Sequence, residues 1–212
     1  MATVLLPSAA AHFPAAVAHV ASGPGPAILA ALLDPAINLV VWERTLGDDL
    51  RAALAAVDLG QLQDVRLALP VCALQAGLSP ALAAAGWHAP ALAADVADLA
   101  QRFSGVMACT AVEIRLDVVR GDACRRFHAD YVPARLVTTY LGPGTDWLPD
   151  DARDETAVRR LAAGAVGLFK GRTWPTERPI IHRSPPIAGT GQVRIVLVIN
   201  PAQDGTHAGT GC

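Results

Sequence analysis

The sequence has little lysine and no clustered positive charge. Lys170 is the only lysine among 17 basic residues, and 19 acidic residues offset them, so the formal net charge is -2. Binding to nucleic acid depends on grouped cations that displace counterions from the phosphates. The sequence shows no such group, so we do not expect nucleic acid as a partner.

Long uninterrupted hydrophobic segments are also lacking, although 52% of the residues are hydrophobic. Residues 1–33 and 67–94 carry no charge and are long enough to be considered as membrane spans. Each stretch is broken by several prolines and by histidine, and no Lys or Arg precedes Arg44, whereas a secretory signal begins with basic residues. We therefore expect no membrane association and a cytoplasmic location.

Cysteine pairs of the C-x-x-C type are absent. The four cysteines, Cys72, Cys109, Cys124 and Cys212, are widely spaced, which excludes a zinc ribbon and a thioredoxin-type motif. A chain of 212 residues can bury a sizeable core without cross-links. We therefore expect one or two domains that fold without disulfides.

Charge is distributed unevenly, with 12 charged residues in positions 1–110 and 24 in positions 111–212. The first part is rich in Ala and Leu, and its periodicity predicts one strand and several helices. The predicted strand covers residues 38–43, and the predicted helices cover 9–21, 26–33, 48–57, 60–66, 79–86 and 91–104. We interpret residues 1–110 as a mainly helical region.

From residue 111 the pattern changes to apolar residues that alternate with polar ones, which is typical of strands with one buried face. Turns that contain Pro or Gly separate the segments, as in β-sandwiches and barrels. The predicted strands cover residues 112–118, 125–131, 135–141, 165–169, 179–183 and 193–199. The sequence therefore predicts an α+β protein in which the helical region packs on a β domain of residues 111–212.

Candidate metal ligands lie in the second part. His128 and Asp130 are two residues apart on a predicted strand, so their side chains leave the same face about 6–7 Å apart at the backbone. His182 lies on another predicted strand. Two histidines and one carboxylate form the ligand set that leaves coordination positions open on mononuclear Fe(II). Arg194 begins the last predicted strand, and its guanidinium could pair with the carboxylate of a co-substrate.

The same residues leave other interpretations open. Cys124 precedes His128 by four residues and would complete a closed four-ligand Zn(II) site with the three residues above. Alternatively, Cys124 lies behind the ligands or fills space, while Arg183 or Ser184 orients the His182 imidazole by a hydrogen bond. A third hypothesis is an interaction protein in which the histidines are core residues.

In this sequence, H-x-D is followed after about 50 residues by a His and after about ten more by an Arg. This order resembles that of the Fe(II)/2-oxoglutarate dioxygenases. Residues 135–141 (RLVTTYL) are similar to the strand that follows H-x-D in that superfamily. Residues 165–171 (AVGLFKG) are similar to the strand and turn before its distal histidine. The interval from His182 to Arg194 is slightly longer than the superfamily pattern, and no Gly-Gly dipeptide follows the second strand.

This resemblance implies a double-stranded β-helix, that is, a jelly-roll or cupin-like fold, for the C-terminal half. It implies a metal-dependent oxygenase with Fe(II) and 2-oxoglutarate as cofactors. His128, Asp130 and His182 would be the metal ligands, and Arg194 and Tyr140 would bind the co-substrate. The substrate, a small molecule or a protein, and the oligomeric state are not specified by any residue pattern.

A closer match, over most of the chain, is to a bacterial family known as domain of unknown function 1826. The resembling segments are residues 38–44 (NLVVWER), 120–130 (RGDACRRFHAD), 139–148 (TYLGPGTDWL), 169–171 (FKG) and 182–186 (HRSPP). Some members look to be encoded near metal-homeostasis proteins. The resemblance therefore also implies an alternative function, a non-catalytic zinc- or iron-binding protein linked to metal homeostasis.

Overall fold

The structure, a computed structural model, describes residues 17–149, 155–176 and 179–202. Its main elements are a seven-stranded sheet, three α-helices and a small three-stranded sheet. In chain order the elements are β1 (Val20–Gly23), the 3-10 helix η1 (Pro26–Leu33), β2 (Leu39–Trp42), α1 (Asp48–Ala55), β3 (Val65–Pro70), the 3-10 turn η2 (Val71–Ala73), α2 (Leu74–Ala84), α3 (Pro90–Met107), β4 (Ala111–Val119), β5 (Ala134–Leu141), β6 (Asp146–Leu148), the 3-10 turn η3 (Glu155–Ala157), β7 (Arg159–Arg160), β8 (Val166–Lys170), β9 (Ile181–Arg183) and β10 (Arg194–Pro201).

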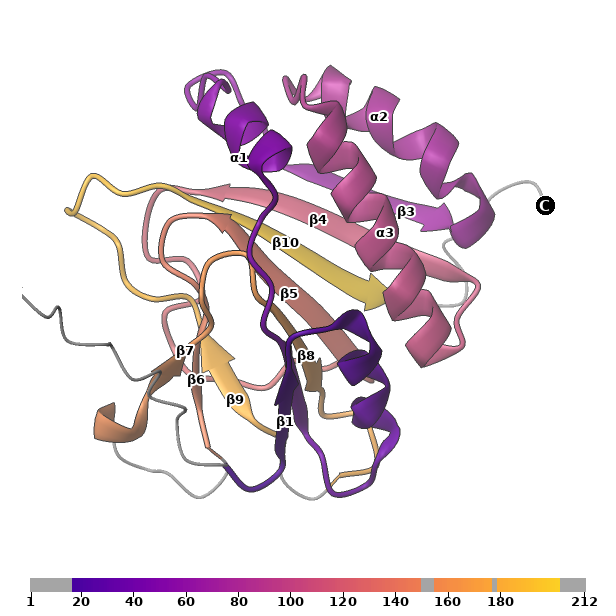
Figure 1. Cartoon of the computed structure of the whole chain (residues 1–212). Helices are drawn as coiled ribbons and strands as arrows, with labels where there is room; N and C mark the ends of the chain where they lie inside the picture. Colours follow the sequence, from indigo (N-terminus) through magenta and orange to yellow (C-terminus); the bar gives the residue numbers. More distant parts are fainter. Residues whose placement is uncertain (1–16, 150–154, 177–178, 203–212) are drawn as a thin grey trace, which may run out of the picture.

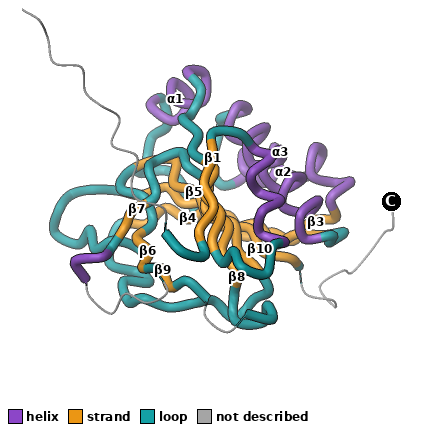
Figure 2. Tube along the Cα trace, turned by 60° about the horizontal axis from the view of Figure 1, so that its bottom comes forward, coloured by secondary structure: helices purple, strands orange, loops and turns teal. Residues whose placement is uncertain are grey.

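The large sheet combines strands from both halves of the chain. Its order is β1-β2-β8-β5-β10-β4-β3, and every neighbouring pair is antiparallel except β1 and β2. The small sheet has the order β7-β6-β9 and is antiparallel throughout. Figures 1 and 2 show that α2 and α3 lie on one side of the large sheet and the small sheet lies on the other. We call the two sides of the large sheet the helix face and the small-sheet face.

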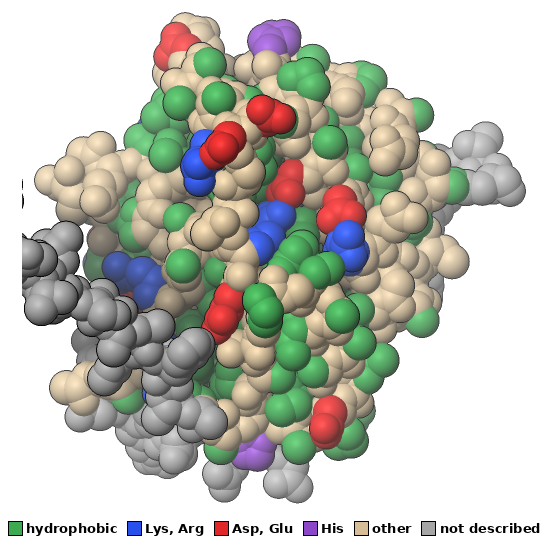
Figure 3. Space-filling view, in the orientation of Figure 1, with side chains coloured by type: hydrophobic (Ala, Val, Ile, Leu, Met, Phe, Trp, Pro, Cys, Tyr) green, Lys and Arg blue, Asp and Glu red, His purple; other side chains and the backbone are tan. Residues whose placement is uncertain are grey.

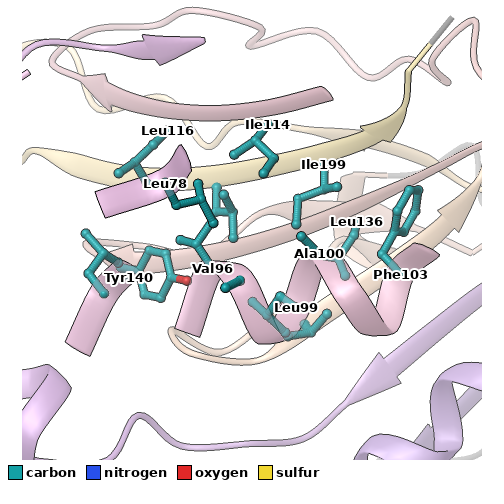
Figure 4. Close-up of a cluster of buried hydrophobic side chains, with 14 of the residues drawn as sticks. Leu78, Val96, Leu99, Ala100, Phe103, Ile114, Leu116, Leu136, Tyr140 and Ile199 are labelled. Atoms are coloured by element: carbon teal, nitrogen blue, oxygen red, sulfur yellow. The ribbon is translucent and has the colours of Figure 1, made fainter. Parts of the chain in front are cut away.

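The main hydrophobic core fills the space between the helix face and the helices. On α3, Leu92, Val96, Leu99 and Phe103 recur at helical spacing and are almost fully buried (Figure 4), which places one stripe of the helix against the sheet. Pro90 begins this helix, where the missing N–H has no cost. Full burial of each such side chain contributes about 1.5–3 kcal/mol, so this contact makes a large contribution to the stability of the fold.

A second, smaller core lies between the small-sheet face and the small sheet. It contains Leu39, Val137, Trp147 and Phe169 together with Val196 and other buried residues. Alternate residues of each strand face the two cores, as the period of a strand requires. His128 and His182 lie beside this second core.

The sequence predicted mixed helix and strand content, and the structure confirms it. The helices predicted at 48–57, 79–86 and 91–104 correspond to α1, α2 and α3, and the segment 26–33 forms the 3-10 helix η1. The strands predicted at 38–43, 112–118, 135–141, 165–169, 179–183 and 193–199 correspond to β2, β4, β5, β8, β9 and β10. No helix in the described ranges is both long and apolar enough to cross a membrane.

Other predicted elements differ from the structure. Residues 60–66 do not form a helix, because Val65, Leu67 and Leu69 alternate with Arg66 and pair with β4 as strand β3. The helix predicted at 9–21 lies largely outside the described residues, and its described end enters β1. Strands β1, β2 and β3, which come from residues 1–110, belong to the same large sheet as strands from residues 111–212.

Candidate metal centre

The structure brings His128, Asp130 and His182 together. One ligand atom from each residue lies within 4.8 Å of the others. His182 Nε2 is 3.0 Å from Asp130 Oδ2, and His128 Nε2 is 3.5 Å from Asp130 Oδ1. Ligand bonds of about 2 Å place the donors of one ion within roughly 4 Å of each other. The three side chains therefore converge at close to the spacing that one metal ion requires.

Backbone pairing, rather than a regular strand, positions the first two of these residues. The strand predicted at 125–131 is a loop in which His128 forms an isolated antiparallel bridge with His182 of β9. Asp130 is fixed two residues later, because its carbonyl oxygen accepts a hydrogen bond of 2.8 Å from the Arg172 N–H. The prediction of two ligands on one strand was therefore wrong in its local structure, although both side chains reach the same point.

The tautomer of His128 follows from its second ring nitrogen. His128 Nδ1 lies 2.8 Å from the carbonyl oxygen of Arg126, and a carbonyl can only accept, so Nδ1 carries the proton. In the neutral ring the lone pair is then on Nε2, which faces Asp130. This is the form of imidazole that binds a metal.

Asp130 is held by a chain of side chains on the small-sheet face. Its Oδ1 accepts a hydrogen bond from Arg135 Nη1, and Arg135 Nε donates to Asn200 Oδ1 at 2.9 Å. Asn200 in turn donates to Glu113 at 3.0 Å. Burial alone would raise the pKa of the Asp130 carboxyl, but His182, Arg135 and His128 outweigh it and hold the pKa below the usual value. Asp130 is therefore ionised at neutral pH.

His182 is buried and neutral. Burial lowers its pKa and prevails over the opposing effect of Asp130. Its ring packs against Phe169, with centroids 4.5 Å apart. Asp130 Oδ2 is buried and lies 3.0 Å from His182 Nε2. A buried carboxylate is costly unless its charge is compensated, and a cation bound between it and the two imidazoles would compensate it, so the residues fit a metal.

Cys124 lies outside the ligand group. It is exposed, has a free thiol and adopts a left-handed backbone (φ 56°), and its sulfur is not among the ligand atoms that converge. Within the described ranges, the closed Zn(II) site that Cys124 would complete is not formed. The carbonyl oxygen of Cys124 instead accepts a hydrogen bond of 3.0 Å from the Ser184 N–H, which ties the loop before His128 to the end of β9.

Arg183 points away from the ligands. Its guanidinium lies over the Phe127 ring, 4.3 Å from the centroid, and its Nε is 3.4 Å from Asp146 Oδ2. The His182 Nδ1 atom has no hydrogen-bond partner in the described part of the chain. Neither Arg183 nor Ser184 therefore orients this imidazole directly, which corrects the prediction made for both.

Arg194 begins β10 and is completely buried. Its Nε donates to the Pro143 carbonyl at 2.7 Å, and its Nη2 approaches the hydroxyls of Thr139 and Thr145 at 3.4 and 3.5 Å. Nη1 has no partner among the described residues. Burial lowers the pKa of Arg194 to about 10, so the guanidinium remains charged at neutral pH and has an unused donor.

A small cavity of about 110 Å³ adjoins the candidate ligands. Its lining includes His128, His182 and Thr145, and Thr145 also contacts Arg194. Arg115 and Asp117 of β4 form another part of the lining and are paired at 2.7 Å. The sequence pattern suggested that the charged residues of β4 face solvent; Glu113 is exposed, but Arg115 and Asp117 are half-buried beside the cavity.

Tyr140 is not part of the site, which corrects its prediction as a co-substrate ligand. Even-numbered residues of β5 face the helices, so the Tyr140 side chain enters the main core. Its hydroxyl donates to Asp95 Oδ2 of α3 at 2.6 Å, and Asp95 is paired with both terminal nitrogens of Arg44 at 2.6 and 2.9 Å. Tyr140 therefore supports the packing of α3 on the sheet.

Comparison with known proteins identifies the family. The model of the family described as "Protein of unknown function (DUF1826)" matches residues 23–200. The chain belongs to the DUF1826 family. No curated protein matches the sequence.

Solved structures show what the fold resembles. A prolyl-4-hydroxylase from Pseudomonas putida superposes with a TM-score of 0.50 at 16% identity, covering 85% of this chain and 99% of that one. A dioxygenase for auxin oxidation from rice superposes with a TM-score of 0.51 at 14% identity, covering 88% of this chain and 83% of that one. A bsmA homologue from Methylobium petroleophilum PM1 superposes with a TM-score of 0.50 at 14% identity, covering 88% of this chain and 96% of that one. At these identities the likeness shows the fold, and it confirms the dioxygenase-like resemblance predicted for this DUF1826 chain.

Proposed function

We propose that this DUF1826 protein is a mononuclear Fe(II)- and 2-oxoglutarate-dependent oxygenase. The observation that carries the proposal is the convergence of His128, Asp130 and His182 without a fourth His, Cys, Asp or Glu ligand in the described ranges. Two imidazoles and one carboxylate leave coordination positions free on Fe(II), as oxygen chemistry requires. The hydroxylase and dioxygenase folds among the structural neighbours support the same reaction class.

The protein's own residues prepare this set for a divalent cation. His182, and then Arg135, hold the pKa of Asp130 below its usual value, and Arg135 fixes Oδ1 by a hydrogen bond while Oδ2 faces His182. Hydrogen bonding of His128 Nδ1 to a carbonyl leaves Nε2 free to bind. Bound iron would supply the oxidising chemistry, in which 2-oxoglutarate, O2 and a substrate C–H group give succinate, CO2 and a C–OH group.

Arg194 is the proposed anchor for the distal carboxylate of 2-oxoglutarate. A buried guanidinium with an unpartnered Nη1 favours an anion, and Thr139 and Thr145 place two hydroxyls beside it. Thr145 also lines the cavity that contains His128 and His182. A dicarboxylate with one end at the metal ligands and the other at Arg194 would therefore be held at both ends.

The test is Fe(II)-dependent formation of succinate by the purified protein. We expect 2-oxoglutarate to be converted to succinate slowly in the absence of substrate, and this conversion to be lost in His128→Ala. His88→Ala is the matched control, because His88 is exposed on the helical side of the molecule and its loss should leave the rate unchanged. Wild-type protein that binds Fe(II) but forms no succinate with any of a panel of substrates would overturn the proposal.

The non-catalytic alternative predicts a different result. One equivalent of Zn(II) that survives purification and is lost in Cys124→Ala would show that Cys124 moves into the ligand set. The exposure of Cys124 and its absence from the converging atoms instead favour an open site. We therefore expect Cys124→Ala to leave metal binding unchanged.

A further inference from the structure

A second and larger cavity, of about 930 Å³, lies apart from the metal ligands. One wall is the small-sheet face of β1 and β2, and the opposite wall comes from β6, β7 and the segment that leads to β8. Figure 3 shows a hollow in this side of the molecule, with basic side chains along its left edge. None of the three predicted metal ligands lines this cavity, so it is a separate site.

Most of the wall is apolar. Val20, Val41, Leu161 and Ala165 contribute aliphatic surface, and Trp147 contributes an aromatic ring. Cavities of about 300–1,000 Å³ with mainly apolar walls and a few polar groups are typical of small-molecule sites. The body of the ligand is therefore expected to be hydrophobic.

Within the described ranges, one cation of this cavity has no carboxylate partner. Arg44 is occupied by Asp95 and by the Gly164 carbonyl, and Arg160 is paired with Asp146 at 2.6 Å. Arg159 has no carboxylate partner among the described residues, and its guanidinium lies over the Trp147 ring, 5.8 Å from the centroid. A guanidinium stacked on an indole keeps its edge available for a carboxylate.

The other rim limits the charge of the ligand. Glu43 follows β2, is exposed, and forms no ion pair within the described structure. Its carboxylate would repel a second anionic group placed at that end of the cavity. Among the described lining residues, Arg159 has no carboxylate partner and Glu43 has no cationic one, and this pair favours a ligand with a single negative charge.

We propose that this cavity binds a hydrophobic molecule with one carboxylate, which Arg159 holds while Val20, Val41 and Trp147 contact the apolar body. Trp147 of β6 is the direct register partner of His182 in β9. The two sites therefore share a strand pair. The proposal concerns binding alone and does not depend on turnover at the metal ligands.

The experiment is calorimetric titration of the full chain with decanoate and naphthalene-2-carboxylate, each compared with its neutral carboxamide. We expect at least one carboxylate to bind about tenfold or more tightly than its carboxamide, because a charge-assisted hydrogen bond to Arg159 would be lost in the amide. Arg159→Gln should remove this difference. Arg66→Gln, which changes an exposed arginine on β3 at the opposite edge of the sheet, should preserve it.

A second variant tests the location. Val41→Phe fills the cavity from its floor and should abolish binding of both carboxylates, with circular dichroism melting to verify that the variant folds. Equal affinity for carboxylate and carboxamide, no binding of either probe, or an unchanged difference in Arg159→Gln would overturn the proposal. Binding seen only after deletion of residues 1–16 would show that the chain itself fills the cavity, and would also overturn it.

Discussion

The backbones of His128 and His182 exchange two hydrogen bonds, with N···O distances of 3.0 and 2.9 Å. This isolated bridge joins a loop to β9 and holds the two imidazole centroids 5.0 Å apart. Because main-chain bonds fix the pair, the two candidate ligands are held close together by the fold itself. Such preorganisation lowers the cost of ordering the site when the ion enters.

Arg135 is expected to act as a positioning residue for the metal. Arg135→Met leaves Asp130 without the donor that fixes Oδ1, and loss of such a contact typically lowers metal affinity about 10–100-fold. Titration calorimetry with Mn(II) measures this effect without turnover. Arg66→Met is the control on β3. Unchanged Mn(II) affinity in folded Arg135→Met would show that the arginine has no part in binding.

Arg194 is expected to affect the co-substrate and not the metal. Arg194→Met should weaken 2-oxoglutarate binding by about 100-fold or more, since truncation of one partner of a buried ion pair costs about 2–5 kcal/mol. Mn(II) affinity should stay the same. Fluorescence or calorimetric titration of the Mn(II)-loaded protein with 2-oxoglutarate measures the co-substrate affinity. Loss of Mn(II) binding in the variant would contradict the expectation that Arg194 does not affect the metal.

A methyl group at Gly171 should disturb the Asp130 loop. A Cβ there would collide with the Val132 carbonyl oxygen and would lie 2.9 Å from the Asp130 carbonyl oxygen. These are backbone atoms that cannot rotate away, so Gly171→Ala should lower both the free energy of unfolding and the affinity for Mn(II). At Gly121 a Cβ meets nothing within 4 Å, and Gly121→Ala should behave as wild type. Two equally stable variants would count against a tight packing at Gly171.

Tyr140 should give the protein a sensitivity to alkaline pH. Burial, and then the charge of Asp95, raise the pKa of the Tyr140 phenol well above 10.0, whereas the unfolded phenol titrates near about 10. The folded state thus keeps a proton that the unfolded state loses. The stabilisation is fully present below about pH 10 and decreases as the pH rises beyond it.

The measurement is urea unfolding between about pH 8 and 11. Tyr140→Phe should lower the free energy of unfolding by about 1.5–3 kcal/mol near neutral pH, because a hydrogen bond to a charged carboxylate is lost. At alkaline pH the wild type should lose stability more steeply than the variant. Parallel curves would mean that Tyr140 does not titrate differently in the folded and unfolded states.

Local periodicity was enough to predict most of the strands and helices. The alternation in residues 112–118 marks β4, and the stripe of Leu92, Val96 and Leu99 marks α3. Residues 60–66 were misassigned because the Ala- and Leu-rich composition hid the alternation that starts at Val65. This segment becomes a strand because it pairs with β4 at the edge of the large sheet, and that pairing depends on the whole sheet.

The candidate ligands could be chosen from the sequence because a metal site needs particular residue types at particular intervals. The roles of Arg135 and Thr145 could not be predicted from the sequence. The role of Arg135 depends on its side chain reaching Asp130, and that of Thr145 depends on a turn that approaches Arg194. Tyr140 shows the opposite error. It has a suitable hydroxyl and lies near the motif in sequence, but the pleat of β5 directs it to the other core.

The order of the large sheet determines when the protein can fold during synthesis. β1 and β2 lie at one edge and β3 lies at the other, although all three are made within the first 70 residues. The strands between them are made later, and β10, which joins β5 to β4, comes last. The early strands β2 and β3 therefore leave the ribosome before their partners β8 and β4 are made, and contacts so distant in sequence form slowly. A chain that stops before β10 would expose unpaired strand edges, and this makes nascent or truncated forms the ones most prone to aggregate.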